Sequence, residues 1–199
     1  MGKCNNMKDI ILIGGGGHCK SVIDVIEQEG RFKIKGIVDK PELLGTNVLG
    51  YSVIGNDSNL DSLAKKYQNA IITVGQIKSP TLRINLFNMA INAGFKFPTI
   101  ISPRAYVSKY STIGKGVVIM HDALINANVK IGDNCIINSK VLIEHDARIY
   151  DHCHISTGAI INGDVVIKNG VFVGSNSTTR EGVVIDNESV KGAGSLILK

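Results

Sequence analysis

The chain has 199 residues, of which 44% are hydrophobic and 20% charged, with a formal net charge of +5. A chain of this length and composition can bury a core, which excludes an intrinsically disordered protein and a collagen-like fibre. Scattered basic residues and only 5% aromatic residues argue against a nucleic-acid surface. Four cysteines without a C-x-x-C pair, no secretory signal and no bilayer-length apolar run predict a cytoplasmic protein with reduced thiols and no membrane span.

The first half alternates apolar strands with helical segments. Strands are predicted at residues 8–13, 33–38 and 70–74, and helices at residues 20–28, 60–67 and 79–93. Such alternation predicts a small α/β domain with a parallel, Rossmann-like sheet over residues 1–98.

Four glycines, residues 14–17, join the first predicted strand to the first predicted helix. Backbone N–H groups of such a loop, here Gly16 and Gly17, can hold a phosphate, and Asp39 at the end of the second strand can hold a ribose hydroxyl. A dinucleotide fingerprint would need a further glycine where Cys19 stands, so a single nucleotide fits better than a nicotinamide cofactor. A tight strand-to-helix turn without a ligand is the alternative.

The second half carries a repeat with a period of six. Of the seventeen positions six apart between residues 101 and 197, fifteen are Ile or Val, and only Thr179 and Lys191 differ. The positions four residues after these anchors all hold small residues. This period predicts a parallel β-helix over residues 99–199, in which three hexapeptides form a coil of eighteen residues and each coil stacks on the next.

Together the two halves resemble the bacterial sugar O/N-acyltransferases of the left-handed β-helix superfamily. That family includes UDP-4-amino-sugar N-acetyltransferases, GDP-perosamine N-acetyltransferase and sialic-acid O-acetyltransferases. The resemblance rests on the strand–GGGGHCK–helix opening, on the strand that ends at Asp39, and on the Ile143-Glu144-His145-Asp146 motif within the hexapeptide register. It implies a left-handed β-helix, a homotrimer, acetyl-CoA as cosubstrate without a metal, and a nucleotide-linked amino sugar as acceptor.

The resemblance also implies roles for individual residues. His145 matches the catalytic base and Asp146 its acidic partner. The positions that match the coenzyme site are Asn138, His154, Gly163, Gly192 and Gly194. The positions that match the nucleotide-sugar site are Gly16, Gly17, His18, Lys20, Asp39 and Lys40.

The eighteen-residue length of one coil supports part of this assignment, because it predicts which residues lie on the same side of the β-helix. His145 and Gly163 are eighteen residues apart, so they stack at one corner on adjacent coils, as a base and a backbone oxyanion donor require. Asn138 and His154 are sixteen apart and fall on one side. His145 and His154 are nine apart and share a site only if His154 comes from a neighbouring subunit. Glu144 is an alternative partner for His145, whereas we expect His121 to be structural or cleft-lining and His152 to face solvent.

The function predicted is acetyl transfer from acetyl-CoA to the amino group of a UDP- or GDP-linked deoxysugar, for surface glycan or glycoprotein synthesis. O-acetylation of sialic acid or another sugar remains open, because a hydroxyl acceptor needs the same base.

A β-helical zinc carbonic anhydrase needs three converging histidines, and the spacing here does not supply them. A purely structural solenoid would not need the glycine loop. The family usually continues past the last coil, so we expect either a shortened chain or a missing cap after Lys199.

Overall fold

A computed structural model describes residues 7–199; Cys4 lies outside them. The chain divides into two compact units. The first holds the described residues up to Gly75 together with Asn85–Pro98, and the second holds Gln76–Ile84 together with Thr99–Lys199. The segment Gln76–Ile84 thus belongs with the second unit, although it lies far from that unit in sequence. The predicted domain boundary after residue 98, and the separate roles of the two domains, stay predictions.

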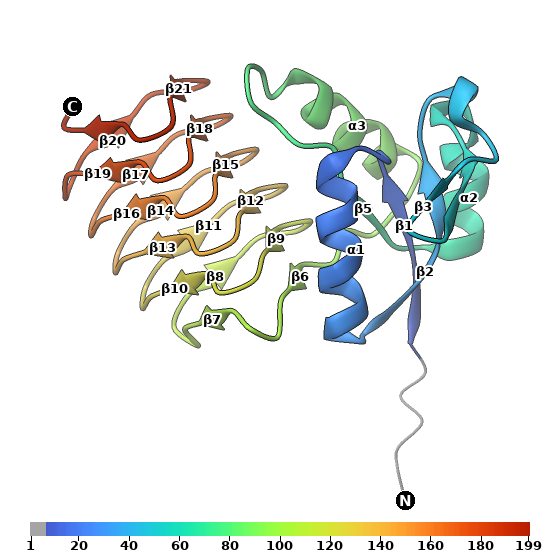
Figure 1. Ribbon diagram of the computed structural model, residues 1–199, viewed down its shortest axis with the longest axis horizontal. Coiled ribbons are helices and arrows are strands. Elements are labelled where there is room, and N and C mark those ends of the chain that lie inside the picture. Colours follow the sequence, from blue (N-terminus) through green and yellow to red (C-terminus); the bar gives the residue numbers. More distant parts are fainter. Residues whose placement is uncertain (1–6) are drawn as a thin grey trace, which may run out of the picture. The chain divides into compact units, whose positions relative to one another are not determined.

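The first unit is built on a five-stranded sheet in the order β3-β4-β2-β1-β5 (Figure 1). β1, β2, β4 and β5 are parallel, and β3 pairs antiparallel with β4. The strands are β1 (Lys8–Ile13), β2 (Phe32–Val38), β3 (Asn47–Val48), β4 (Tyr51–Gly55) and β5 (Ala70–Ile72). β1 lies between β2 and β5, which explains its uninterrupted apolar run, because an interior parallel strand is buried on both faces.

The helices follow the predicted order: α1 (Gly17–Glu29) and α2 (Leu60–Tyr67) belong to the first unit, with 3-10 turns η1 (Pro41–Leu43) and η2 (Asp57–Asn59). The third helix, α3 (Thr81–Asn92), begins in the segment that belongs to the second unit and continues into the first. α1 begins three residues before the predicted start, directly after Gly16. It ends at Gly30, whose left-handed backbone lets its N–H bond to the carbonyl of Ile26 at 3.0 Å. The short β3–β4 hairpin was not predicted, because its two strands are brief and lack an alternating pattern.

The second unit is the parallel β-helix that the repeat predicts, left-handed as the family resemblance implies, with three sheets of parallel strands. One sheet, here called sheet E, holds β7 (Tyr106–Val107), β10 (Leu124–Ile125), β13 (Leu142–Ile143), β16 (Ile160–Ile161), β19 (Thr178–Thr179) and β22 (Leu196–Ile197). Sheet F holds β8 (Thr112–Ile113), β11 (Lys130–Ile131), β14 (Arg148–Ile149), β17 (Val166–Ile167) and β20 (Val184–Ile185). Sheet D holds β6 (Ile100–Ile101), β9 (Val118–Ile119), β12 (Ile136–Ile137), β15 (His154–Ile155), β18 (Phe172–Val173) and β21 (Val190–Lys191).

Every strand pairs with the strand eighteen residues away, so the coils stack without a register shift. The second residue of each strand is the anchor of the repeat and points inward, where the anchors form one apolar core with the small residues between them. From Gly116 onward every corner has one residue with a left-handed backbone, and non-glycine residues supply it at many of them, including Asn134, Asp146 and His152. Asn and Asp adopt this conformation at low cost.

The first residue of each strand points outward, and these residues differ between the sheets. On sheet D, Ile100, Val118 and Ile136 are fully buried, and His154 and Phe172 are nearly so. On sheet E the outward positions are partly or largely exposed and, except for Thr178, apolar, whereas sheet F presents charged groups such as Lys130 and Arg148. Among residues 7–199, no helix combines the length and the apolar character that crossing a membrane would require.

Candidate functional site

The glycine loop follows β1 and leads directly into α1. At Gly14 a side chain is impossible, because an added Cβ would lie 2.3 Å from Cγ2 of Val74. Gly16 and Gly17 instead have open space where a side chain would be, with nothing within 4 Å of an added Cβ. The loop is therefore tightly packed at its start and open at the helix end, which leaves backbone accessible where an anion could approach.

Asp39 holds this loop from the end of β2. One carboxylate oxygen accepts the Gly15 N–H at 2.5 Å, and the other accepts the Lys40 N–H at 2.8 Å. The structure therefore brings Asp39 to the glycine loop, as the sequence predicts for two parallel neighbours. Because the Gly15 N–H is already bonded to Asp39, a bound anion would have to use the open Gly16–Gly17 part of the loop.

The remaining predicted residues of this region lie around the same loop. His18 is half-buried on the first turn of α1, and an added Cβ on Gly75 would lie 3.7 Å from its Cβ. Lys20 and Lys40 are both exposed, so their ammonium groups are free to reach an anion. Cys19 is fully buried, and burial raises the pKa of its thiol to about 11, so it serves as packing below the loop.

His145 lies at the corner that follows β13. Its Nδ1 lies 2.8 Å from Oδ2 of Asp146, and its side chain is 58% exposed. The left-handed backbone of Asp146 turns that carboxylate back toward the preceding ring. The hydrogen bond to Asp146 raises the pKa of His145 above 6.5, and no acceptor or donor among residues 7–199 engages its Nε2.

The carboxylate of Asp146 is itself held from the coil before. Its Oδ1 accepts a hydrogen bond from Nδ2 of Asn128 at 2.6 Å, and this bond together with His145 lowers its pKa. Glu144 is occupied differently: its Oε2 accepts from Nδ2 of Asn126 at 2.8 Å. Of the two acidic neighbours that the sequence offers, Asp146 is the one in contact with the imidazole of His145.

Gly163 lies beside His145 on the next coil. An added Cβ on Gly163 would be 2.8 Å from Cε1 and 3.0 Å from Nε2 of the imidazole, so glycine alone leaves the ring in place. Gly163 is buried, and within the described part of the chain its N–H has no acceptor. The eighteen-residue spacing thus places a free ring nitrogen next to a free backbone donor, which is the pairing that acyl transfer requires.

Asn138 and His154 meet at sheet D, as their spacing predicts. Nδ2 of Asn138 lies 3.3 Å from Nε2 of His154, and Asn138 is partly exposed. His154 is 7% exposed and its Nδ1 lies 2.6 Å from the carbonyl oxygen of Gln76. Burial lowers the pKa of His154 to about 4, so its ring is neutral at ordinary pH. Both residues lie on a different sheet from the corner of His145 within one chain.

Gly192 and Gly194 lie on the last coil and are exposed. An added Cβ on Gly174, one coil before, would lie 2.5 Å from the carbonyl carbon of Gly192, whereas an added Cβ on Gly192 itself would lie 3.8 Å from Oγ of Ser195. The other histidines of the β-helix are engaged within the fold. Nδ1 of His121 lies 2.7 Å from Oγ of Ser102. His152 is half-buried and not fully solvent-facing as expected, because its Nδ1 lies 3.0 Å from Nδ2 of buried Asn134.

No group of three His, Cys, Asp or Glu side chains within residues 7–199 could hold a metal ion. Cys135 and Cys153 are stacked in the core with no disulfide, and Cys135 has a pKa raised well above its usual value by burial. They are core thiols, as the repeat predicts.

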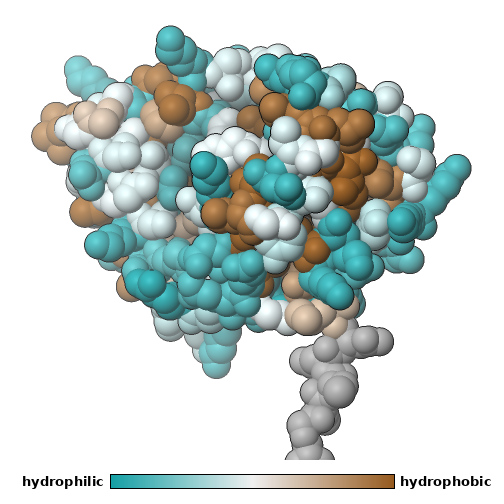
Figure 2. Space-filling view, turned by 45° about the vertical axis from the view of Figure 1, so that its right-hand side comes forward, coloured by the Kyte–Doolittle hydropathy of each residue, from teal (hydrophilic) through white to brown (hydrophobic). Residues whose placement is uncertain are grey.

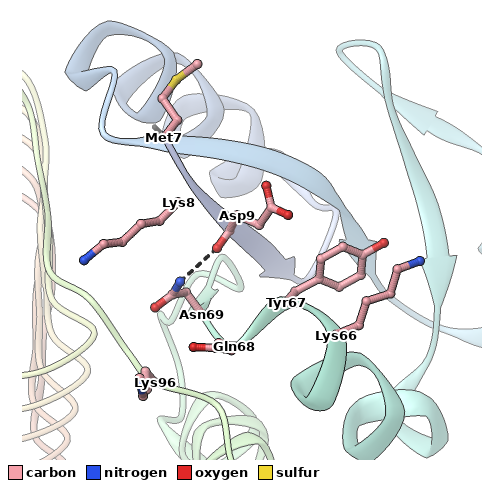
Figure 3. A pocket seen from close by; sticks show the side chains of 8 residues that line it. All are labelled: Met7, Lys8, Asp9, Lys66, Tyr67, Gln68, Asn69 and Lys96. Carbon is pink, nitrogen blue, oxygen red and sulfur yellow. Dashed lines mark hydrogen bonds between the residues drawn. The ribbon is translucent and has the colours of Figure 1, made fainter. Parts of the chain in front are cut away.

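A pocket of about 590 Å³ lies in the first unit, at the end of β1 opposite the glycine loop (Figure 3). None of the predicted site residues lines it. Its walls are polar and basic: Met7, Lys8, Asp9, Lys66, Tyr67, Gln68, Asn69 and Lys96. The candidate site therefore does not coincide with this pocket and is defined by the corner and the loop described above.

Sequence reasoning missed Gln76 and Arg83. Arg83 is almost fully buried, and its Nε donates to the carbonyl of Asn134 at 3.2 Å. In the sequence, Arg83 lies in a predicted helix, where a charged residue is usually exposed to solvent, so the sequence did not indicate this contact. The only sequence signal is that Pro80 interrupts the path between β5 and α3 and marks a segment that is not a simple loop.

The chain thus combines a hexapeptide-repeat β-helix with an α/β unit that carries a glycine loop. Residues 110–145 match the family model described as bacterial transferase hexapeptide (six repeats), and residues 9–90 match the PglD N-terminal domain. With the solved structures described next, these matches place the chain among the sugar acyltransferases of the hexapeptide superfamily. No curated protein matches the chain.

Solved structures with both units are similar over almost the whole chain. The acetyltransferase domain of PglB from Neisseria gonorrhoeae has 29% sequence identity and a TM-score of 0.89 over 96% of this chain and 91% of that one. A mutant perosamine N-acetyltransferase from Caulobacter crescentus, in complex with CoA and GDP-perosamine, has 28% identity and a TM-score of 0.68 over 94% and 92%. WeeI from Acinetobacter baumannii, at 21% identity and a TM-score of 0.85 over 97% and 92%, shares the fold.

Proposed function

We propose that this protein transfers an acetyl group from acetyl-CoA to the amino group of a nucleotide-linked amino-deoxysugar, for surface glycan or glycoprotein synthesis. The observation that carries the proposal is the corner at His145, where Asp146 holds Nδ1 and leaves Nε2 next to the free N–H of Gly163. A base and an oxyanion donor on adjacent coils are the two groups that direct acyl transfer to an amine needs.

In the proposed reaction the amine nitrogen attacks the thioester carbonyl carbon, and Nε2 of His145 takes the proton that the nitrogen loses. The new N–C bond forms as the C–S bond breaks, and the coenzyme A thiolate leaves. Asp146 fixes the ring with its proton on Nδ1 and stabilises the imidazolium that forms. The Gly163 N–H donates to the oxygen that becomes negative. Neither a metal nor a covalent acyl-enzyme takes part.

The first unit supplies the binding site for the sugar nucleotide. Gly16 and Gly17 offer open backbone, His18 lies beside them, and Lys20 and Lys40 are exposed cations for phosphate groups. Asp39 holds the loop through the Gly15 N–H, and its carboxylate accepts a ribose hydroxyl. Asn138, His154, Gly163, Gly192 and Gly194 line the coenzyme site in this proposal.

Relatives of similar architecture support the choice of substrates. The PglB domain from Neisseria gonorrhoeae has been solved in complex with acetyl coenzyme A, at 28% identity and a TM-score of 0.87. Two histidine mutants of the Caulobacter crescentus enzyme have been solved with both CoA and GDP-perosamine.

We further propose that the active protein is a homotrimer in contact through sheet E. Most outward residues of this sheet are apolar, and Tyr106, Leu124 and Leu196 are 60%, 38% and 68% exposed. Figure 2 shows apolar groups gathered in several patches among hydrophilic ones. Burial of these outward apolar side chains of sheet E between copies would remove apolar surface from water. It would also let Asn138 and His154 of one copy approach His145 of the next, which a single chain cannot achieve.

The location proposed is the cytoplasm. The buried cysteines Cys19, Cys135 and Cys153 are all free thiols, which suits a reducing compartment.

The test of the proposed function is thiol release from acetyl-CoA with a panel of acceptors. The panel contains UDP- and GDP-linked 4-amino-4,6-dideoxy sugars together with free and CMP-linked sialic acid. We expect release with one nucleotide-linked amino sugar. Thiol release with sialic acid alone would replace the proposal by O-acetylation. If the protein binds acetyl-CoA but no acceptor of the panel causes thiol release, nucleotide-linked amino sugars are not its acceptors.

Asp39→Ala tests the role of the first unit separately. The substitution removes the carboxylate that accepts the Gly15 N–H, so we expect the KM for the sugar nucleotide to rise about tenfold or more. The affinity for acetyl-CoA, measured by calorimetry, should stay within about twofold of the wild-type value. Equal loss of both affinities would show that the glycine loop has another role.

A further inference from the structure

The segment Gln76–Ile84 is anchored on the β-helix at both of its ends. Near its start, Nε2 of Gln76 donates to the carbonyl oxygen of Gly170 at 3.1 Å, and Pro80 packs against the same glycine. Near its end, Arg83 donates to the carbonyl of Asn134. Asn134 and Gly170 are thirty-six residues apart, so they occupy the same corner two coils apart. The segment therefore forms a strap along that corner.

His154 lies under the start of this strap. The carbonyl oxygen of Gln76 can only accept a hydrogen bond, so the contact of 2.6 Å requires the proton of the neutral imidazole to be on Nδ1. Phe172 packs edge-to-face against the ring, with centroids 5.2 Å apart, and holds its plane. Nε2 is consequently a fixed acceptor that points away from Gln76, and the lowered pKa of His154 keeps it unprotonated.

The acceptor on His154 faces the amide of Asn138. Oδ1 of Asn138 accepts the N–H of Ser139 at 2.8 Å, which assigns the other end of the amide as Nδ2. One hydrogen of Nδ2 goes to Nε2 of His154 at 3.3 Å. The second hydrogen has no acceptor within the described residues, and Asn138 is partly exposed. The amide is thus fixed at both ends and presents one N–H outward.

We propose that the strap residue Gln76 positions Asn138 through His154, so that Asn138 offers a single, fixed hydrogen-bond donor to an acceptor oxygen of the acyl donor. The inference rests on the proposed function, which places Asn138 at the coenzyme site. It assigns His154 as a positioning residue and leaves the contact with substrate to Asn138. A donor held in place before substrate binds costs no reorganisation during the reaction.

A double-mutant cycle tests whether His154 acts through Asn138. Asn138→Ala removes the donor and is expected to lower kcat about 10- to 100-fold. His154→Asn retains an amide donor for the Gln76 carbonyl and removes the acceptor that faces Asn138, so we expect a similar loss. The double variant should be no slower than Asn138→Ala alone. Losses that multiply, or a His154→Asn defect confined to coenzyme affinity, would overturn the proposal.

Two further variants separate positioning from folding. His154→Gln carries an amide oxygen at about the place of Nε2, and we expect it to recover at least part of the kcat that His154→Asn loses. Gln76→Ala removes the bond to Gly170 and should lower kcat in the wild-type background and not in the His154→Asn background. His152→Asn is the matched control, since it changes a neighbouring half-buried histidine and should keep the wild-type kcat. Absence of rescue by His154→Gln, with both variants folded, would count against the acceptor role.

An observation independent of activity completes the test. Nitrogen NMR of histidine-labelled protein at pH 7 should show His154 as the tautomer with its proton on Nδ1, and the Nε2 shift should change in Asn138→Ala. If the wild-type protein transfers no acetyl group and these signals are as expected, the proposed function fails and the positioning contact remains. A proton on Nε2 of His154 would overturn the contact whatever the activity.

Discussion

His145 and His154 are nine residues apart on the same β-helix, and their surroundings give them opposite properties. His145 lies exposed at a corner, where Asp146 raises the pKa of its imidazole above 6.5. His154 lies on sheet D under Gln76, where burial lowers the pKa of its imidazole to about 4. A repeat that looks uniform in its core therefore carries one exposed histidine with a raised pKa and one buried histidine that is neutral at ordinary pH.

The difference arises from the outward side of the coils, because the inward side is the same at both places. Ile143 and Ile155, the anchors of the two strands, are both fully buried in one core. What differs is the element outside: a strap covers His154, and nothing within the second unit covers His145. The core fixes the stacking of the coils, and the outer contacts decide the chemistry of each histidine.

The largest effect should come from removing the exposed histidine. His145→Ala deletes the proposed proton acceptor, so we expect kcat to fall about 10²–10⁴-fold while acetyl-CoA binds with nearly unchanged affinity. Steady-state kinetics and calorimetry on the same preparation measure both quantities. Full activity of His145→Ala would remove this residue from the mechanism, and His152→Asn serves as the histidine control with expected wild-type rates.

The buried histidine should appear in stability and not in proton transfer. His154 has a folded-state pKa of about 4, below its value near 6.5 in an unfolded chain, so the unfolded state binds more protons between these values. The free energy of unfolding should therefore decrease as the pH falls from about 6.5 to about 4, by about 3 kcal/mol from this group. Urea unfolding across that range measures it, and His154→Asn should show a shallower decrease. Identical slopes in the two proteins would contradict the buried neutral state.

A smaller effect is expected from crowding the exposed ring. In Gly163→Ala the new Cβ would lie 2.8 Å from Cε1 of His145, and the exposed ring can move aside with little cost in folding free energy. We expect kcat to fall about tenfold with an unchanged melting temperature. A melting temperature that falls together with kcat would indicate that Gly163 serves coil stacking and not the geometry of the site.

The smallest effect concerns the pH dependence of the reaction. Asp146→Asn removes the carboxylate that raises the pKa of His145, and Asn is compatible with the left-handed backbone at this position. The base acts in its deprotonated form, so the rate rises with pH through its pKa. The acid limb of the profile of kcat should therefore move to lower pH in the variant. A limb that stays in place would assign it to another group.

Much of the β-helix could be predicted from the sequence because its period is regular. The anchor series determined which residues point inward, and the eighteen-residue coil brought His145 to Gly163 and Asn138 to His154. The alternation of strands and helices likewise predicted the parallel sheet. Because neighbouring parallel strands end at the same edge, it also predicted that Asp39, after the second strand, lies at the glycine loop.

The strap could not be predicted in the same way. Gln76 and His154 are 78 residues apart, and no periodicity links a loop after β5 to an outward position of sheet D. The one available signal was Pro80, which interrupts the path between β5 and α3 without identifying what the segment contacts.

The separation of the two histidines is tested most directly by a nitrogen NMR titration of the histidine side chains in the wild-type protein between pH 5 and pH 9. We predict that His145 titrates with a midpoint above 6.5 and that His154 stays neutral throughout, with its proton on Nδ1. Assignment by His145→Ala and His154→Asn identifies the two signals. A midpoint for His154 near 6.5, or one for His145 below it, would contradict the account of how this β-helix divides the two roles.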